Sequence, residues 1–231
     1  MIMHVWHWLE GLKMYQWLNI LTFLYYLMYK RSNKSYRIYA IFLFFIISME
    51  TVLFRILQRS TDYFNFFHTL FSMTCLVFYQ YIFIQKLRNT RSYLPFAIIC
   101  IIFQLASWID IAIYFDPQMF RPFIYVIGML IVNLMIYAYF YKVVFKDEFK
   151  HISQFPEVWL ALGISIYFVA SFPLLLFLDF LRDEITIRKP YFDLLSLGNL
   201  ILSIGYLMTV IKIPVAKRSK SWEPIEISES Y

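Results

Sequence analysis

Residues 38–57 read IYAIFLFFIISMETVLFRIL, and this stretch decides the fold. At about 1.5 Å of rise per residue, a helix of this length crosses the roughly 30 Å hydrocarbon core of a bilayer. The stretch contains Glu50 and Arg55. Each charge would cost about 2.5–3.5 kcal/mol if it faced lipid at a helix centre. We therefore expect a transmembrane helix whose two charged side chains point into a protein interior.

The composition extends this interpretation to the whole chain. Hydrophobic residues make up 61% of the 231 residues and charged residues 16%, where soluble domains have about 45–50% and about 25%. A soluble protein of this length could not bury so much apolar surface. The net charge of +6 is explained by basic loops on one side of a membrane. Membrane lipids are therefore the expected surroundings, and no nucleic-acid partner is expected.

Seven apolar segments are long enough to cross a bilayer. No loop between them is long enough to form a second domain. The sequence thus predicts an all-α polytopic membrane protein, with a seven-helix transmembrane domain over residues 1–213 and a short, disordered tail over residues 214–231. The expected helices cover residues 12–29, 38–57, 64–85, 94–115, 123–145, 157–178 and 194–213.

Prolines mark the ends of these segments. Pro95, Pro122 and Pro156 fall at or near the starts of three of them, where the missing backbone N–H costs nothing. Pro173 lies deep inside the sixth segment, so a kink is expected near Phe172. Such a kink serves either as a hinge or as a static packing feature.

Basic residues fall mainly at alternate segment ends. Fourteen of the 21 Lys and Arg residues follow the first, third, fifth and seventh segments, and six lie on the other side. Cytoplasmic loops of membrane proteins carry the excess of Lys and Arg. This alternation predicts an N-terminus outside, a tail in the cytoplasm and a location in the plasma (inner) membrane.

Polar residues recur at helical spacing inside several segments. His68, Ser72, Cys75 and Tyr79 share one face of the third segment, and Asn133 and Tyr137 are placed together on the fifth. Such faces are expected to line the bundle interior. The candidate ligand-binding site or buried polar network comprises Glu50, Arg55, His68, Gln104, Asp110, Asn133 and Asn199.

Most of the charged candidates share one membrane depth, toward the outer end of their helices. Glu50 and Arg55 are five residues apart, too far around the helix to pair with each other. Three interpretations are open for these residues: a pocket that opens outward for a ligand or ion, a structural ion-pair network, or side chains that snorkel to the membrane edge. The pairings open to them are Arg55 with Asp110 or Asp179, and Glu50 with His68 or Asn199.

Motifs that carry catalytic chemistry are missing from the sequence. It contains no H-E-x-x-H, Walker A loop, G-x-G-x-x-G or G-x-S-x-G. His4 and His7 could join His68 at a metal, but two histidines among interfacial tryptophans are more often interfacial. Cys75 and Cys100 lie within apolar segments, which supports neither a disulfide nor a metal site. We therefore expect no enzyme activity, no metal and no cofactor.

The residues Pro156-Glu157-Val158-Trp159 are followed by Gly163, Tyr167 and a Phe-rich run to Phe180. This pattern, over the fifth to seventh segments, resembles seven-helix membrane modules of bacterial sensor histidine kinase systems. These 231 residues contain no kinase domain, so the resemblance leads us to expect signalling through a separate cytoplasmic or membrane partner. No site residue is taken from the resemblance.

Two functions of different class remain open. One is a small sensor or accessory signalling subunit with an outward-facing polar pocket. The other is a transporter of a small polar solute or proton, in which Glu50 and Asp110 titrate. Transporters often contain internal repeats, and the sequence shows no convincing one.

Overall fold

The computed structural model describes residues 13–30, 36–53, 64–113, 122–145, 153–176 and 185–214. Within these residues all regular structure is helical. The elements are α2 (Met14–Tyr25), η1 (Tyr26–Lys30), α3 (Arg37–Ile47), η3 (Ser48–Leu53), α5 (Phe64–Leu87), α6 (Tyr93–Ile113), α7 (Pro122–Phe145), α8 (Pro156–Leu176) and α10 (Ile185–Lys212).

Five of these helices are long and apolar enough to cross a membrane, which makes the chain a helical membrane protein. Their spans agree with the third to seventh segments expected from the sequence. They are Phe66–Leu87, Tyr93–Ile113, Phe123–Lys142, Pro156–Pro173 and Asp193–Lys212.

The first two expected segments each contain an α-helix that continues directly into a π-helix. α2 runs into η1, and α3 runs into η3, which carries Glu50. The described part of the second segment ends at Leu53, so Arg55 lies outside the described residues. π-Helical turns are rare and are often found at functional sites, which draws attention to Glu50.

Two helices, α10 and α8, bear on the boundaries that we expected from the sequence. α10 begins at Ile185, well before the expected start at residue 194. The expected span agrees with the apolar part of this helix, which begins at Asp193, and the helix extends further toward its N-terminus. α8 continues through Pro173 to Leu176, so the proline does not end the helix, and the kink near Phe172 stays a prediction.

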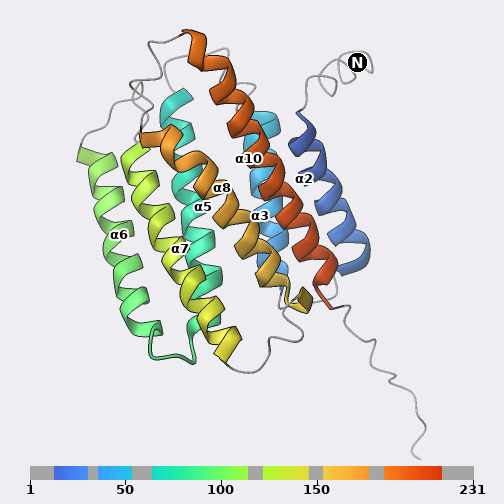
Figure 1. Cartoon of the computed structure of the whole chain (residues 1–231), viewed down its shortest axis with the longest axis vertical. Helices are drawn as coiled ribbons and strands as arrows, with labels where there is room; N and C mark the ends of the chain where they lie inside the picture. The colour runs from blue at the N-terminus through green and yellow to red at the C-terminus, as the bar shows by residue number, and fades with distance from the viewer. Residues whose placement is uncertain are drawn as a thin grey trace, which may run out of the picture.

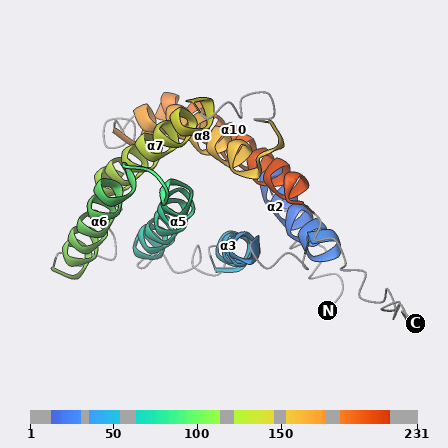
Figure 2. The same ribbon diagram turned by 90° about the horizontal axis from the view of Figure 1, so that it is seen from below.

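The helices form a curved wall with two helices on its concave side. In the end-on view (Figure 2), α6, α7, α8, α10 and α2 follow one another along an arc, and α5 and α3 lie inside it. α10 packs against both α8 and α2, and α5 packs against α7 and α6. Successive helices alternate in direction (Figure 1). α2 and α10 are neighbours in space although they lie far apart in the sequence.

Aromatic rings fill the space between α3 and α5. Phe42 of α3 is fully buried, with its ring centroid 4.8 Å from that of Phe78 and 5.3 Å from that of Tyr79. Its third ring neighbour is Tyr206 of α10, at 5.8 Å. Phe42 therefore joins α3, α5 and α10 at the centre of the bundle.

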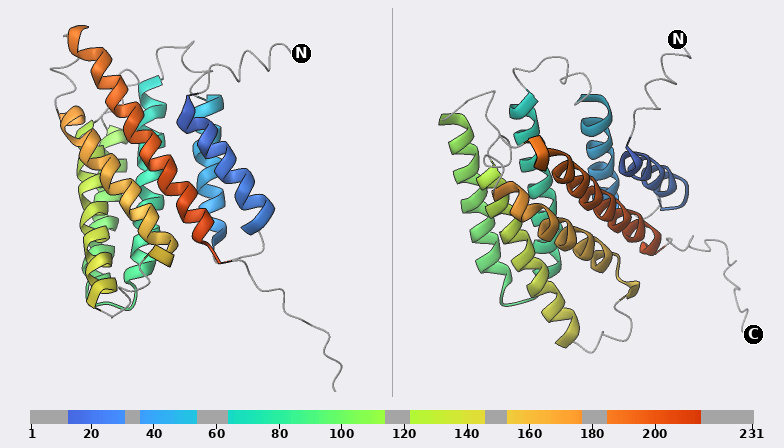
Figure 3. Two further views of the ribbon diagram at one scale, coloured as in Figure 1. Left: turned by 45° about the vertical axis from the view of Figure 1, so that its right-hand side comes forward. Right: turned by 45° about the horizontal axis from the view of Figure 1, so that its top comes forward.

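α8 and α10 approach each other through glycines, and Figure 3 shows the two helices side by side. A Cβ atom at Gly205 would lie 3.0 Å from Cα of Gly163 and 3.1 Å from the carbonyl oxygen of Trp159. Further along, a Cβ atom at Gly198 would lie 3.8 Å from Cβ of Ala170. Small residues let helix backbones pack closely in membranes, so this seam sets the register of α8 against α10.

α6 lies at one end of the wall and exposes most of its apolar surface. Only 17% of its apolar span is buried inside the protein, and large side chains such as Ile101, Ile102 and Leu105 are exposed. This surface suits lipid. Tyr137 of α7 also faces outward, with 72% of its surface exposed. The expectation that it lines the interior was wrong, because the packing of α7 turns that position away from its neighbours.

Candidate functional site

The polar site around Glu50 is built from α2 and η3. The side-chain Nε2 of Gln16 donates a hydrogen bond to the backbone carbonyl of Glu50, with the atoms 3.3 Å apart. The Asn19 side chain lies close enough to the Glu50 carboxylate to hydrogen-bond with it. We call Gln16, Asn19 and Glu50 the Glu50 site, and the end of the bundle that holds it the Glu50 end.

Two oxygen atoms of this site are buried without a hydrogen-bond donor. They are Oδ1 of Asn19 and Oε2 of Glu50, and neither has a partner within the described part of the chain. Only 2% of the surface of Asn19 is exposed. A buried acceptor that loses its water costs about 1–3 kcal/mol unless a donor replaces it. The site therefore needs a hydrogen-bond donor from a solute, a water molecule or a proton.

Buried tyrosines extend the polar region toward the centre of the bundle. The hydroxyls of Tyr79 and Tyr206 hydrogen-bond to each other, and Tyr125 hydrogen-bonds with Tyr167. Tyr206 lies close enough to Glu50 to interact electrostatically. The third-segment stripe predicted from the sequence is confirmed as an inward face, since its members Ser72, Cys75 and Tyr79 are buried.

The other predicted candidates occupy separate places on α5 and α6. His68 of α5 is half-buried, and its ring centroid lies 6.5 Å from that of Phe71 in a T-shaped contact. Gln104 of α6 donates through Nε2 to Oε1 of Gln80 on α5 at 2.8 Å. Asp110 is half-buried on the same helix as Gln104. Gln104 therefore joins two helices rather than entering the Glu50 site.

The remaining candidates are as follows. Asn133 of α7 donates to the carbonyl of Met129, one turn earlier in its own helix, at 2.9 Å. Asn199 of α10 is half-buried. Arg55 and Asp179 lie outside the described residues, so the proposed pairings of Arg55 stay predictions. The hydrogen bonds that the structure shows for Glu50 run to Gln16 and Asn19 of α2, and its pairing with His68 or Asn199 stays a prediction.

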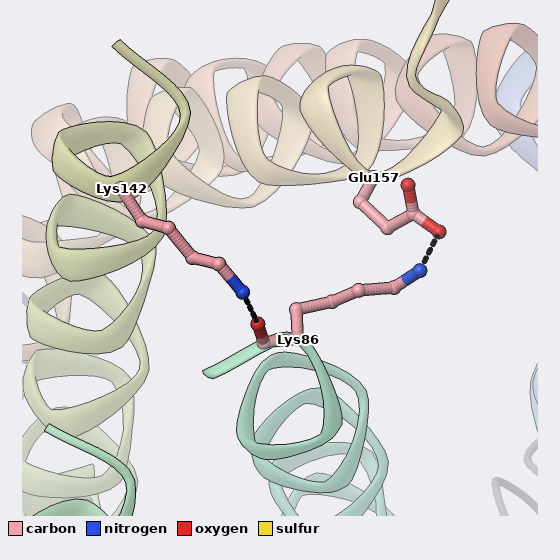
Figure 4. Close-up of polar contacts among 3 residues, drawn as sticks. All are labelled: Lys86, Lys142 and Glu157. Carbon is pink, nitrogen blue, oxygen red and sulfur yellow. Dashed lines mark hydrogen bonds and ion pairs between the residues drawn. The ribbon is translucent and has the colours of Figure 1, made fainter. Parts of the chain in front are cut away.

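A second polar cluster lies at the opposite end of the bundle, which we call the basic end. Figure 4 shows Lys86 between Glu157 and Lys142. Nζ of Lys86 lies 2.6 Å from Oε1 of Glu157, at the start of α8. Nζ of Lys142 donates to the backbone carbonyl of Lys86 at 2.6 Å. These contacts fasten the end of α5 to α7 and α8.

Glu157 is almost fully buried, and two positive partners compensate its charge. One is the Lys86 ammonium, and the other is the N-terminus of α8, where Glu157 follows the first residue, Pro156. Nζ of Lys86 also lies 6.0 Å from the ring centroid of Tyr36, at the limit of a cation–π contact. Burial and the nearby Glu157 carboxylate raise the pKa of the Tyr36 phenol to about 12. The ring is therefore neutral at physiological pH.

Lys30 completes the basic end. This residue is the last of η1 and is buried, and its Nζ donates to the backbone carbonyl of Ile213 just beyond α10. A lysine at the C-terminal end of a helix satisfies a carbonyl that has no partner within the helix. Lys30 thus holds the end of α10 against the end of the first helical segment.

Sequence reasoning missed Asn19 and the roles of Lys30, Lys86 and Glu157. A signal for the first segment was present, because Tyr15, Asn19, Thr22 and Tyr26 recur at spacings typical of one helix face. Of these, Asn19, Thr22 and Tyr26 are buried. In the sequence, the lysines indicated only the orientation of the chain in the membrane, because positively charged loop residues usually face water or headgroups.

Within the described ranges, no three His, Cys, Asp or Glu residues gather in a way that could hold a metal ion. His4 and His7 lie outside those ranges. No protein-family model, curated protein or solved structure matches this chain. The two polar clusters are therefore the features of the structure that bear on function.

Proposed function

We propose that this chain is a seven-span plasma-membrane protein that acts as a small sensor or accessory signalling subunit. Its N-terminus would lie outside and its tail in the cytoplasm. A small solute that offers hydrogen-bond donors would bind at the Glu50 site, and a separate cytoplasmic or membrane partner would read the response at the basic end. The observation that carries this proposal is the pair of buried, unsatisfied acceptors on Asn19 and Glu50.

The chemistry of the Glu50 site favours a cationic solute. Its buried acceptors are a carboxylate oxygen and an amide oxygen, and a carboxylate is an acceptor only. An ammonium group would supply both the donors and the positive charge. The site belongs to two helical segments that hydrogen-bond to each other, so a bound solute would act on both.

α2 and η1 supply a physical route from this site to the basic end. Gln16 and Asn19 lie near the start of α2, and Lys30 ends η1 with its ammonium on the carbonyl of Ile213. The tail follows directly after Ile213 and Pro214. A shift of this first segment on binding would therefore change the contact that holds the last residues before the tail.

Reporter fusions test the proposed topology. Fusions after Lys34 and after Lys220 are expected to report cytoplasm, and a fusion after Arg188 is expected to report the outside. These positions sample both sides of the predicted alternation of basic residues. A cytoplasmic signal after Arg188 would contradict the seven-span arrangement.

Ligand-dependent stability tests the site. A panel of small ammonium compounds, beginning with ethanolamine, would be added to the full-length protein in detergent. A ligand at 100 times its Kd stabilises a protein by about 2.7 kcal/mol. The expected compound raises the melting temperature of wild type and not that of Glu50→Gln. Equal stabilisation of both proteins would place binding elsewhere, and no response across the panel would remove the support for a cation site.

A readout at the basic end tests the sensor role. Spin labels at two exposed positions, Arg88 and Ile211, would report the separation of the ends of α5 and α10. The two native cysteines are buried, so they need not be replaced. The stabilising compound is expected to change this distance in wild type and not in Glu50→Gln. An unchanged distance in a protein that binds the compound would contradict signal transfer.

A transporter is the second candidate, and one observation favours it. Polar groups continue inward from Glu50 through Cys75 to the hydrogen-bonded hydroxyls of Tyr79 and Tyr206. Proteoliposomes loaded with the compound distinguish the two functions. Counterflow of the radiolabelled compound that Glu50→Gln abolishes would favour transport, and binding without flux would favour the sensor.

A further inference from the structure

Two acceptor atoms of the Glu50 site lack a hydrogen-bond donor, and one added proton would satisfy both. Oδ1 of Asn19 and Oε2 of Glu50 are both buried acceptors without a donor among the described residues. The two side chains are hydrogen-bonding neighbours. An ionised carboxylate cannot donate, whereas a carboxylic acid has one O–H donor. The hydrogen bonding of this pair therefore depends on the protonation state of Glu50.

An amide and a carboxylic acid can form two hydrogen bonds in one ring. The Asn19 amide N–H donates to one oxygen of the acid, and the acid O–H donates to the amide oxygen. This arrangement uses both of the oxygens that are otherwise unsatisfied. We infer that Glu50 carries a proton in the resting protein and shares it with Asn19, so that the Glu50 site is a proton-binding site.

The surroundings of Glu50 agree with a neutral side chain. The groups that act on it electrostatically include Lys13 just before α2, Tyr15 from α2, Cys75 from α5 and Tyr206 from α10. Lys13 is the one permanent cation in this set, and its side chain is exposed at the start of α2. An isolated carboxylate in a low-dielectric interior normally takes up a proton unless a charge pairs with it. Among the described residues, the surroundings of Glu50 offer amides and hydroxyls instead.

Glu157 provides an internal comparison. Among the described residues it is the one acidic residue that is buried as a whole, and its Oε1 lies 2.6 Å from the ammonium of Lys86. Glu157 is therefore an ionised carboxylate in an ion pair. On this inference, two glutamates with buried carboxylate oxygens are in opposite states, one at each end of the bundle. This inference concerns the resting protein with no solute bound. A cation bound at the site would take the place of the proton, and Glu50 would then be ionised.

Infrared difference spectroscopy on the full-length protein in lipid nanodiscs tests this assignment at pH 7. The spectrum of wild type minus Glu50→Gln is expected to contain one carboxylic-acid C=O band that shifts in D2O. The matched control, wild type minus Glu157→Gln, is expected to contain carboxylate bands and no carboxylic-acid band. A carboxylate signal for Glu50 at pH 7 would overturn the inference.

Thermal stability supplies a second readout. The Glu50→Gln side chain can make the same two hydrogen bonds to Asn19, so its melting temperature at pH 7 is expected to equal that of wild type. Asn19→Leu removes both bonds and is expected to lower it, and to shift the Glu50 band in the infrared spectrum. Unfolding caused by Glu50→Gln, or an unshifted band in Asn19→Leu, would contradict a shared proton.

Discussion

The ammonium of Lys86 lies 2.6 Å from Oε1 of Glu157, and this ion pair joins the end of α5 to the beginning of α8. The Glu157 side chain is 3% exposed and that of Lys86 is 37% exposed. The pair therefore lies at the boundary of the interior, where one charge is fully desolvated and its partner still reaches water. Lys142 adds a contact from α7 to the backbone of Lys86. Three helices are fixed to one another at the basic end through Lys86.

The first prediction concerns this ion pair. Lys86→Met leaves the buried Glu157 charge with only the N-terminus of α8 to compensate it, and is expected to destabilise the protein by about 1–3 kcal/mol. This is less than the 3–5 kcal/mol for a fully buried pair, because Lys86 is partly exposed. Adding Glu157→Gln is expected to recover much of the loss. Unfolding in detergent measures the stability of each variant, and Arg88→Ala is the exposed control. Strictly additive effects would show that the two side chains are not coupled.

Two phenylalanines of α3 make a matched pair for testing the core. Phe42 is 1% exposed and contacts three aromatic rings, whereas Phe44 is 59% exposed. Phe42→Ala is expected to cost about 3–5 kcal/mol, as buried Phe-to-Ala changes do. Phe44→Ala is expected to stay within about 0.5 kcal/mol of wild type. Comparable losses from the two changes, measured by thermal unfolding, would contradict this assignment of the two faces.

The glycine seam between α8 and α10 leads to a third prediction. A Cβ atom at Gly205 would meet backbone atoms of Gly163 and Trp159, which cannot move without shifting a helix. Gly205→Ala is expected to cost about 1–3 kcal/mol, as overpacking does. At Gly198 the first contact is 3.2 Å from a ring carbon of Tyr167, a side chain that can shift. Gly198→Ala is therefore the control and should cost less; the reverse order would place the seam elsewhere.

The fourth prediction concerns the amides that join α5 to α6. Nε2 of Gln104 donates to Oε1 of Gln80, and Gln80 is buried. Gln104→Leu would leave the Gln80 amide unsatisfied and is expected to cost about 1–3 kcal/mol. The double change with Gln80→Leu removes both amides and should be less harmful than the single one. A double-mutant cycle in detergent measures the coupling energy between the two amides. For interhelical hydrogen bonds in membranes this energy averages about 0.6 kcal/mol.

The sequence by itself determined that the chain is helical and lies in a membrane. In hydrocarbon each backbone polar group must find a partner within the protein, so a long apolar segment forms a helix. This argument needs only length and hydropathy. It located the apolar spans of α5, α6, α7, α8 and α10. It also predicted the inward face of α5, because polar residues at 3.6-residue spacing must avoid lipid.

Only the tertiary structure decided which polar residues meet. Helical periodicity gives the face of one helix but not its rotation or depth against another, and these depend on packing such as the contact of Gly163 with Gly205. Glu50 therefore meets Asn19, and Tyr137 turns outward.

Lysines at the basic end illustrate the same limit. In the sequence Lys30 and Lys86 indicated orientation alone. In the fold, their long side chains reach the carbonyl of Ile213 and the carboxylate of Glu157. Both partners lie far away along the chain, and three-dimensional packing alone brings such groups within hydrogen-bonding distance.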